Sequence, residues 1–437
     1  MTQPPDLSPL QAAPLPDEPS DARNSKPAFW SAALPLLALG LLEGLIARAS
    51  DGDPRLALLG LIGFAIGVTL LGTNFGFSIA FRRAVEGDPV IFRAHAVMFA
   101  LATIIIVPIL AQGSVLGQAV EGFSNPIGPA FILGAAIFGI GMQMSGGCAS
   151  GTLYLLGGGN AKFLAVLLAF ILGSTIGAAH MGFWWSLPSL PPMTVFTIGP
   201  WPLGLALDLA GFAAVAWATL RFGWPEHDRI GWKQPIRESY SNCLNRDGLT
   251  EWVASTHSDP ALGALPRRLL LGAIALALLN AATVLVAGRP WSETYGFALW
   301  GSKLAGELGW HPEDWAFWQD SPSLSGSIFI DKTSIMDMSI ILGAFAAGSW
   351  SGRLTPQLGG SWRSWLAGAF GGLMMGYGAR LSGGCNIGAY FSAIASGDFS
   401  GWIWAAAALT TTMIGVRARR WIESFRARGT DPSPIAP

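Results

Sequence analysis

The amino-acid sequence predicts an all-α, polytopic membrane protein of about ten spanning or re-entrant helices, arranged as an internal inverted repeat. The first observation is composition: hydrophobic residues make up 51% of the 437 residues and charged residues only 12%, whereas a soluble domain carries about 25% charged residues. The second is the absence of Asp, Glu, Lys and Arg from 122–161 and from 163–207. The third is a motif that occurs once in each half of the chain.

Hydrophobic segments predict the spans in chain order. A stretch of about 18 apolar residues with few charges can cross a bilayer as a helix. Small residues, here including 56 glycines, let membrane helices pack closely. The expected spans lie near 28–48, 56–81, 94–118, 127–144, 162–186, 200–221, 268–287, 335–351, 364–380 and 401–418.

Polar segments divide these spans into regions. Residues 1–27 are rich in Pro, Asp and Ser and lack the basic start and apolar core of a cleavable signal peptide, so we expect a disordered N-terminal tail. Residues 222–266 are expected to form a cytoplasmic linker between the halves, and 289–336, with five tryptophans among acidic residues, an extracytoplasmic loop. The other regions are a first membrane half over 28–221, a connecting span over 267–288, a second membrane half over 337–418 and a C-terminal tail over 419–437.

Basic residues in the short connections predict the orientation, because Lys and Arg are enriched in cytoplasmic loops. With ten spans and both termini in the cytoplasm, all four basic clusters fall on the cytoplasmic side of the membrane. These clusters are Arg82, Arg83 and Arg93; Arg229, Lys233, Arg237 and Arg246; Arg353 and Arg363; and the basic run 417–420 with Arg426 and Arg428.

The repeated motif is a glycine-rich stretch that ends in cysteine. The segment "GIGMQMSGGCASG", from Gly139, aligns with "GYGARLSGGCNIG", from Gly376, and seven of the thirteen positions are identical. In the expected topology, the spans that precede Cys148 and Cys385 run in opposite directions. Inverted repeats with glycine-broken hydrophobic segments at matching places point to the binding site of a transporter.

The chemistry of the motif favours an anion with a soft atom. Irregular backbone at membrane depth survives only where it is buried in protein or lines a cavity, and Gly146, Gly147, Gly383 and Gly384 can adopt positive φ angles and direct amide groups at one point. A thiol is a soft, weak donor. A glycine bend that ends in a thiol therefore suits a sulfur-containing anion. The third cysteine, Cys243, lies in the polar linker and is expected to be incidental.

Other polar residues near the motif are further candidates for contact with substrate. Arg380 stands at the position that Gln143 occupies in the first repeat, and an arginine at membrane depth is costly and usually functional. Ser145, Ser382 and Asn386 could donate to anion oxygens, although local backbone bonding is an equal alternative. For Asp208 and Glu43, helix–helix bonding or nearness to an interface is expected, with proton transfer as the alternative.

The paired Ser-Gly-Gly-Cys blocks, the Gly-x-Gly ahead of each and the Gly three residues after each Cys resemble the YeeE/YedE family of sulfur-compound transporters. The resemblance covers roughly 56–220 and 335–420. It implies an hourglass-shaped inner-membrane protein that takes up thiosulfate, with Cys148 and Cys385 lining the narrow path and contacting substrate sulfur. Family members often carry another cysteine near the opening helix of the first repeat, and this chain has Gly76 there.

The implied partners are a small sulfur-containing anion, the lipid bilayer and, as a candidate acceptor, a cytosolic sulfur-carrier protein. No nucleic-acid partner, cofactor, metal or enzymatic activity is expected. One alternative is a membrane thiol enzyme that handles persulfide sulfur, but no His or Lys lies within four residues of either motif cysteine to activate it. The other is a soft-metal or selenium-compound permease, for which Met142 and Met144 are the nearest additional ligands.

Overall fold

The computed structural model describes residues 29–221 and 265–424, apart from 320, 353, 355, 356, 358 and 360. The expected tail over 1–27 lies outside the described residues. So does the expected linker over 222–266, except for its last two positions. The C-terminal tail expected from 419 begins inside a helix, because α17 continues to Ser424.

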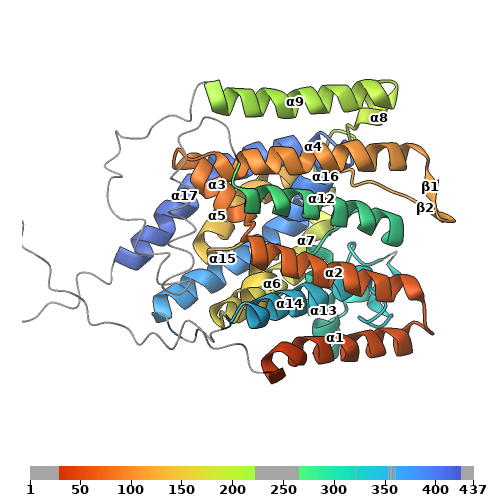
Figure 1. Cartoon of the computed structure of the whole chain (residues 1–437), viewed down its shortest axis with the longest axis vertical. Helices are drawn as coiled ribbons and strands as arrows, with labels where there is room; N and C mark the ends of the chain where they lie inside the picture. Colours follow the sequence, from red (N-terminus) through yellow and green to blue (C-terminus); the bar gives the residue numbers. More distant parts are fainter. Residues whose placement is uncertain are drawn as a thin grey trace, which may run out of the picture.

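Helices make up nearly all of the described chain. Ten of the described helices have 17 residues or more, which confirms the all-α fold class. They are α1 (Phe29–Ala49), α2 (Pro54–Thr73), α4 (Val90–Ala111), α5 (Pro129–Ser145), α7 (Lys162–Trp185), α9 (Trp201–Arg221), α12 (Arg267–Ala287), α14 (Lys332–Trp350), α15 (Trp362–Leu381) and α17 (Ser400–Ser424). Figure 1 shows most of them lying side by side.

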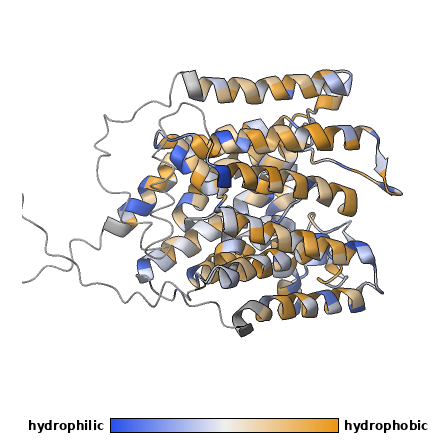
Figure 2. Ribbon diagram, viewed as in Figure 1, coloured by the Kyte–Doolittle hydropathy of each residue, from blue (hydrophilic) through white to orange (hydrophobic). Residues whose placement is uncertain are grey.

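Six of the described helical stretches are long and apolar enough to cross a membrane. Hydrophobic residues cover most of the length of the long helices in Figure 2. Leucines exposed along α1, α2 and α7, such as Leu41, Leu61 and Leu168, face away from the core. A polytopic membrane protein accounts for these exposed apolar faces, because lipid covers them.

Short elements join the long helices. They are α3 (Phe77–Val85), the hairpin β1 (Ser114–Val115) and β2 (Gln118–Ala119), α6 (Ala149–Gly157), α8 (Val195–Ile198), α13 (Thr294–Glu307), the 3₁₀ turns η3 (Pro312–Asp314) and η4 (Pro322–Leu324), the π-helical turn η5 (Asn386–Ser392) and α16 (Ala393–Ala395). The strands of the hairpin are antiparallel, with Ser114 opposite Ala119.

Three elements differ from the sequence-based expectations. The span expected over 56–81 is broken after Thr73, where Asn74 takes a left-handed conformation and α3 starts afresh at Phe77. The span expected over 94–118 ends at Ala111, and positive-φ glycines at 113 and 117 then form the hairpin. The segment expected to be one loop over 289–336 contains helix α13, half of whose residues are buried.

The central helices α5 and α15 cross as an antiparallel pair. Gly134 lies against the carbonyl of Gly378, and Gly141 against the carbonyl of Gly371. Rising numbers on one helix therefore meet falling numbers on the other. The two copies of the motif are 237 positions apart, so Gly134 corresponds to Gly371 and Gly141 to Gly378. Replacing each glycine by its counterpart turns the first contact into the second. This is the pattern of a two-fold axis that relates inverted repeats.

The surrounding helices repeat the same exchange. Helix α7 packs on α15 as α17 packs on α5, and α6 packs on α14 as α16 packs on α4. The outer pairs α1 with α14 and α9 with α4 follow the same relation. By these contacts α1–α7 corresponds to α9–α17. Helix α9, which the hydropathy pattern had grouped with the first half, thus takes the place that α1 has in the other repeat.

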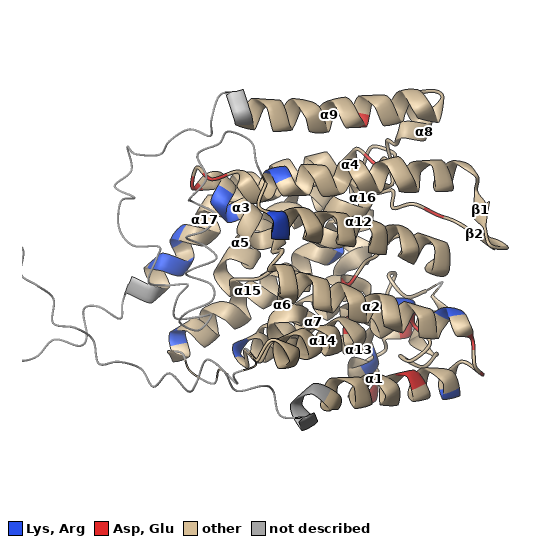
Figure 3. Ribbon diagram, viewed as in Figure 1, with Lys and Arg blue, Asp and Glu red and all other residues tan. Residues whose placement is uncertain are grey.

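Charged side chains lie mainly at the two ends of the helices. Basic residues gather around α3, the start of α12 and the end of α17 (Figure 3); this surface, which includes Arg82, Arg83, Arg267, Arg268 and 417–420, is called the basic end below. At the opposite end, acidic and basic residues are mixed. Between the ends, the core contains both motif cysteines.

Candidate functional site

The two glycine-rich bends have the same construction. Helix α5 ends at Ser145, and Cys148 is the N-cap of α6, with φ −89° and ψ −164°. Helix α15 ends at Leu381, and Cys385 is the N-cap of η5, with φ −105° and ψ −164°. Each thiol therefore stands where a broken helix restarts. The thiols are buried, with exposures of 1% and 0%.

The glycines serve the bends in two ways. Gly146, Gly383 and Gly384 have φ angles of 86°, 69° and 156°, a region that side chains disfavour. Gly147, which could also have taken a positive φ angle, does not. A methyl group there would lie 2.8 Å from the Phe163 ring, so its small size allows the bend to pack against α7.

The motif serines close their own bends. The Ser145 hydroxyl reaches the carbonyls of Gly141 and Gly147 at 3.0 and 2.8 Å. The Ser382 hydroxyl reaches those of Gly378 and Gly384 at 2.9 and 3.2 Å. A hydroxyl has one proton to donate, so the local backbone uses it here. Contact of these serines with an anion stays a prediction.

Amides of the first bend are also engaged. The Gly146 N–H donates to the Met142 carbonyl at 3.2 Å, and the Gly147 N–H donates to Ser145 Oγ at 3.4 Å. The expected anion nest of consecutive glycine amides is therefore not open at this bend. Each thiol still stands at the start of the following helix. The N–H groups at a helix start carry partial positive charge.

Each sulfur has polar contacts at the start of its helix. Cys148 Sγ lies 3.3 Å from Ser150 Oγ, and Cys385 Sγ accepts from the Ile387 N–H at 3.4 Å. Asn386, next to Cys385, donates through Nδ2 to Met142 Sδ of the other repeat at 3.8 Å, and its Oδ1 has no partner among the described residues. The two bends thus meet in the middle of the molecule.

Gln143 and Arg380 hold equivalent tethers. Gln143 Nε2 donates to the Ser78 carbonyl in α3 at 3.1 Å. Arg380 Nη2 donates to Thr294 Oγ1 in α13 at 2.7 Å. Gln143 therefore connects the last turn of α5 to α3, and Arg380 connects the last turn of α15 to α13. Arg380 is 7% exposed, and its Nε has no partner among the described residues.

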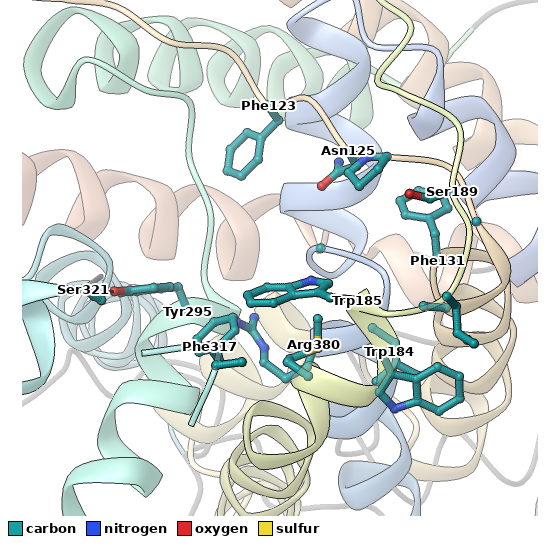
Figure 4. Close-up of a pocket in the computed structure, with 18 of the residues that line it drawn as sticks. Phe123, Asn125, Phe131, Trp184, Trp185, Ser189, Tyr295, Phe317, Ser321 and Arg380 are labelled. Carbon is teal, nitrogen blue, oxygen red and sulfur yellow. Dashed lines mark hydrogen bonds between the residues drawn. The ribbon is translucent and has the colours of Figure 1, made fainter. Parts of the chain in front are cut away.

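A cavity of about 730 Å³, called the vestibule below, lies beside the second bend (Figure 4). Arg380 projects into the group of aromatic rings around it, and its guanidinium lies 5.3 Å from the centre of the Phe317 ring. Arg289 stacks on Phe123 at 5.2 Å. These two arginines are the charged residues among the described lining, which also includes Asn125, Trp184, Trp185, Ser292, Tyr295 and Gly383.

The opposite face of the first bend also meets cations. Lys162 Nζ donates to the Ser145 carbonyl at 3.2 Å. A methyl group on Gly146 would lie 2.6 Å from Arg419 Nη1. Both side chains are buried, with 7% exposure each. A positive group therefore lies close to each bend, Arg380 at the second and Arg419 with Lys162 at the first.

Gly76, at which the chain departs from the family pattern described above, lies at the break between α2 and α3. A methyl group there would lie 3.0 Å from Ile79 Cδ1 and 3.2 Å from the Tyr154 hydroxyl. A larger side chain would have to displace one of them. The position is thus tightly packed in this chain, and the site has two motif thiols.

Two carboxyl groups were not singled out from the sequence. Glu293 and Asp337 are both fully buried, and Glu293 Oε2 lies 3.7 Å from Cys385 Sγ. Glu293 was assigned to an exposed loop because the sequence around it is polar, and Asp337 was counted as part of an ordinary span. Acidic residues close to apolar segments were the available signal. Among the described residues, no three His, Cys, Asp or Glu side chains group to hold a metal ion.

Comparison with known proteins adds a family. A family model described as "Sulphur transport" matches residues 72–414. The match includes both bends and the vestibule residues, and it leaves out α1.

Three curated relatives are similar in sequence. The probable transporter YedE of Escherichia coli strain K12 is 30% identical over 132 residues, which are 30% of this chain and 33% of the relative. YedE of Salmonella typhimurium strain LT2 is 28% identical over the same shares. The chain thus aligns with about a third of the length of these two relatives. The thiosulfate transporter TsuA of Spirochaeta thermophila is 26% identical over 357 residues, 78% of this chain and 92% of the relative.

Proposed function

The chain belongs to the sulphur transport family, and we propose that it carries thiosulfate, or a closely related sulfur-containing anion, inward across the bacterial inner membrane. The path runs from the vestibule, between the two Gly-Gly-Cys bends, to the basic end. The name of the relative TsuA supports thiosulfate as the first substrate to test.

The observation that carries this proposal is the pair of thiols that cap restarted helices in the core. A helix start attracts negative charge. A thiol adds a soft S–H group that can point at a sulfur atom. Two such positions, related by the inverted repeat and close together, let a sulfur anion move in short steps. Weak binding at each step allows the anion to leave again.

The vestibule supports inward movement of an anion. Arg289 and Arg380 give its described lining two positive charges, and a cavity with one sign of charge concentrates ions of the other sign. Ser292 and Gly383 lie on its wall next to the second bend. An anion that is held beside Arg380 is thus close to Cys385. At the far side of the first bend, Lys162 and Arg419 attract the departing ion.

Uptake of sulfur-labelled thiosulfate into proteoliposomes tests the substrate. The purified full-length protein is expected to fill the vesicles, and unlabelled thiosulfate to suppress the signal. Sulfate, which has the same charge but no exposed sulfur, should compete at least roughly tenfold less well, the equivalent of about 1.4 kcal/mol. Equal competition by sulfate would show that the thiols do not select for sulfur.

Two measurements separate transport from its alternatives. The intact mass of the protein after exposure to thiosulfate is expected to be unchanged. A stable gain of one sulfur atom would instead support the membrane thiol enzyme. Metal analysis of the purified protein is expected to find less than one soft-metal ion per chain. Stoichiometric metal, together with competition by it, would support a soft-metal permease.

A further inference from the structure

Two buried acidic side chains lie beside the second thiol. Glu293 precedes α13, and its Oε2 is 3.7 Å from Cys385 Sγ. Asp337 lies on α14, where a methyl group added to Gly296 would be 2.7 Å from Asp337 Oδ2. Gly296 is one helical turn after Glu293. Asp337 therefore lies against the first turn of α13, at whose start Glu293 stands. Neither is exposed to solvent.

Neither carboxyl group is neutralised by a described residue. Glu293 Oε1 and both oxygens of Asp337 have no hydrogen-bond partner in the part of the chain that the structure describes. The ionisable groups around them on the packed elements are Cys385 on η5, Cys148 on α6, Asp331 on α14 and Arg380 on α15. Arg380 directs its Nη2 to Thr294, and Asp331 caps α14 through the Ser334 N–H at 2.8 Å. An unpaired carboxylate is strongly disfavoured in such an interior, so each group holds a proton at rest.

The other repeat has no such pair. Gly76 is the residue directly before α3, as Glu293 is the residue directly before α13, so the described first half has no carboxyl group at that place. His95 and Asp337 are each the sixth residue of their helices, α4 and α14. His95 packs among aromatic rings, with its ring centre 4.7 Å from that of Phe77. The acidic pair is therefore a property of one half, on the side of the vestibule.

A dianion that passes Cys385 must pass next to this pair. An ionised Glu293 would repel it, and a protonated Glu293 would not. The anion also favours the protonated form, because a negative charge nearby makes loss of the proton harder. Proton occupancy and anion occupancy at this point thus favour each other, which is reciprocal coupling between two ligands.

We propose that Glu293 and Asp337 carry protons that accompany the anion, so that the chain is a proton–anion symporter. This inference rests on the proposed function. The groups take up two protons from the vestibule side, with Asp337 supplying Glu293. They release them on the other side after the anion has passed, when water that enters the opened path solvates the two carboxylates. No covalent bond forms or breaks apart from O–H exchange. Two protons and one dianion move no net charge, so the inside-negative membrane potential does not oppose import.

The stoichiometry can be measured in proteoliposomes at zero membrane potential, held with potassium and valinomycin. An inward gradient of one pH unit is worth about tenfold in accumulation per coupled proton. Two protons predict a plateau of roughly hundredfold accumulation of thiosulfate for the unaltered protein. Glu293→Gln and Asp337→Asn are each expected to lower the plateau to about tenfold or less, because each removes one proton carrier. The plateau is an equilibrium quantity, so slower transport does not change it.

Two further variants complete the design. Glu43→Gln removes another carboxyl group, which has no hydrogen-bond partner within 29–221 and 265–424 as described and lies on α1 against Gly60 of α2. This variant should keep the hundredfold plateau. Glu293→Asp retains a carboxyl group and should also respond to the pH gradient, which separates loss of the proton from damage to the fold.

Exchange of labelled for unlabelled thiosulfate without a gradient separates the two levels of the proposal. Exchange with no response of the plateau to pH overturns the symport inference and leaves the transport function standing. An unchanged plateau in both Glu293→Gln and Asp337→Asn also overturns it, because other groups would then carry the protons. Absence of exchange in the unaltered protein overturns the transport function and the symport together.

Discussion

Cys148 and Cys385 occupy positions at which other residues stabilise a helix better. Both motif thiols are helix N-caps. Ser, Thr, Asp and Asn cap helices more effectively, because their oxygen atoms are stronger acceptors for the first amides. Packing does not require sulfur either, since serine is nearly the same size. Capping and packing therefore leave the thiols unexplained, and the proposed soft contact with a sulfur anion would account for them.

Arg380 is the residue that should govern substrate capture. Arg380→Gln keeps a polar side chain, the one that the equivalent position of the first repeat carries, but removes the positive charge from the vestibule. A hydrogen bond to a charged group contributes about 1.5–3 kcal/mol, so half-saturation for thiosulfate should rise roughly 10- to 100-fold. The measurement is uptake as a function of concentration.

The matched control for this change is Arg363→Gln. Arg363 stacks on Trp362 at the other end of the same helix and should leave half-saturation unchanged. If both variants raised half-saturation equally, Arg380 would affect thiosulfate binding through the net charge of the protein and not through a local contact.

Residue patterns predicted part of this site. The repeated block identified both thiols and paired Gln143 with Arg380, and the structure gives that pair equivalent tethers. The block could not show that the serines and first-bend amides bond within the bends, because such contacts depend on the exact closure of the turn. Glu293 was missed because it is distant in sequence from the block, and only the return of the chain at α13 brings it to Cys385.

At the scale of elements, the crossing of α5 and α15 holds the two bends together. The helices approach through glycines, so that backbone meets backbone at Gly134, Gly141, Gly371 and Gly378. Close approach of this kind lets dispersion forces and weak hydrogen bonds act between membrane helices, where the hydrophobic effect is small. The distance between the two thiol bends depends on this crossing.

Gly378→Ala tests the crossing. The added methyl group would lie 2.6 Å from the Gly134 carbonyl oxygen, so the helices must separate. Overpacking of this kind costs about 1–3 kcal/mol. We expect the melting temperature in detergent to fall by several degrees, to an extent that scales with that free energy, and uptake to fall with it.

Gly40→Ala serves as the control, because no atom lies within 4 Å of the added group. It should leave the melting temperature unchanged or raise it slightly, since alanine favours helix. A normal melting temperature for Gly378→Ala would contradict the tight crossing.

Element positions could largely be predicted from hydropathy, but their breaks could not. Each of the ten long helices overlaps an expected span. The division of 56–81 at Asn74 was not anticipated, because the whole stretch is apolar enough to span as one helix. Helix α13 was missed for the opposite reason: its polar surroundings resemble a loop, while tertiary contacts with α7 and α14 bury it.

At the scale of the whole molecule, the inverted repeat produces two unlike faces. The vestibule with Arg380 lies on one side of the paired thiols. Arg419 and Lys162 lie on the other, near the basic end. The start of α1 and the end of α17 lie toward the same end in Figure 1. Because basic connections favour the cytoplasm, the vestibule should face outward and the basic end inward.

Reporter fusions test this orientation. A reporter that is active only in the cytoplasm should be active at both termini, and one that is active only outside should be active when inserted at Gly117 in the hairpin. The opposite pattern would reverse the direction of the path. The function of the molecule would then be export of the anion rather than import.

Uptake of labelled thiosulfate by Cys148→Ser and Cys385→Ser tests the central claim most directly, in cells without other importers of sulfur anions and with membrane abundance measured for each variant. Serine keeps the size and the cap but removes the soft contact. Each variant should therefore lose roughly tenfold or more of the uptake rate, the equivalent of about 1.4 kcal/mol. Cys243→Ser, outside both bends, should transport normally. Normal uptake by both motif variants at normal abundance would show that the thiols only fill space, and that the anion does not pass between them.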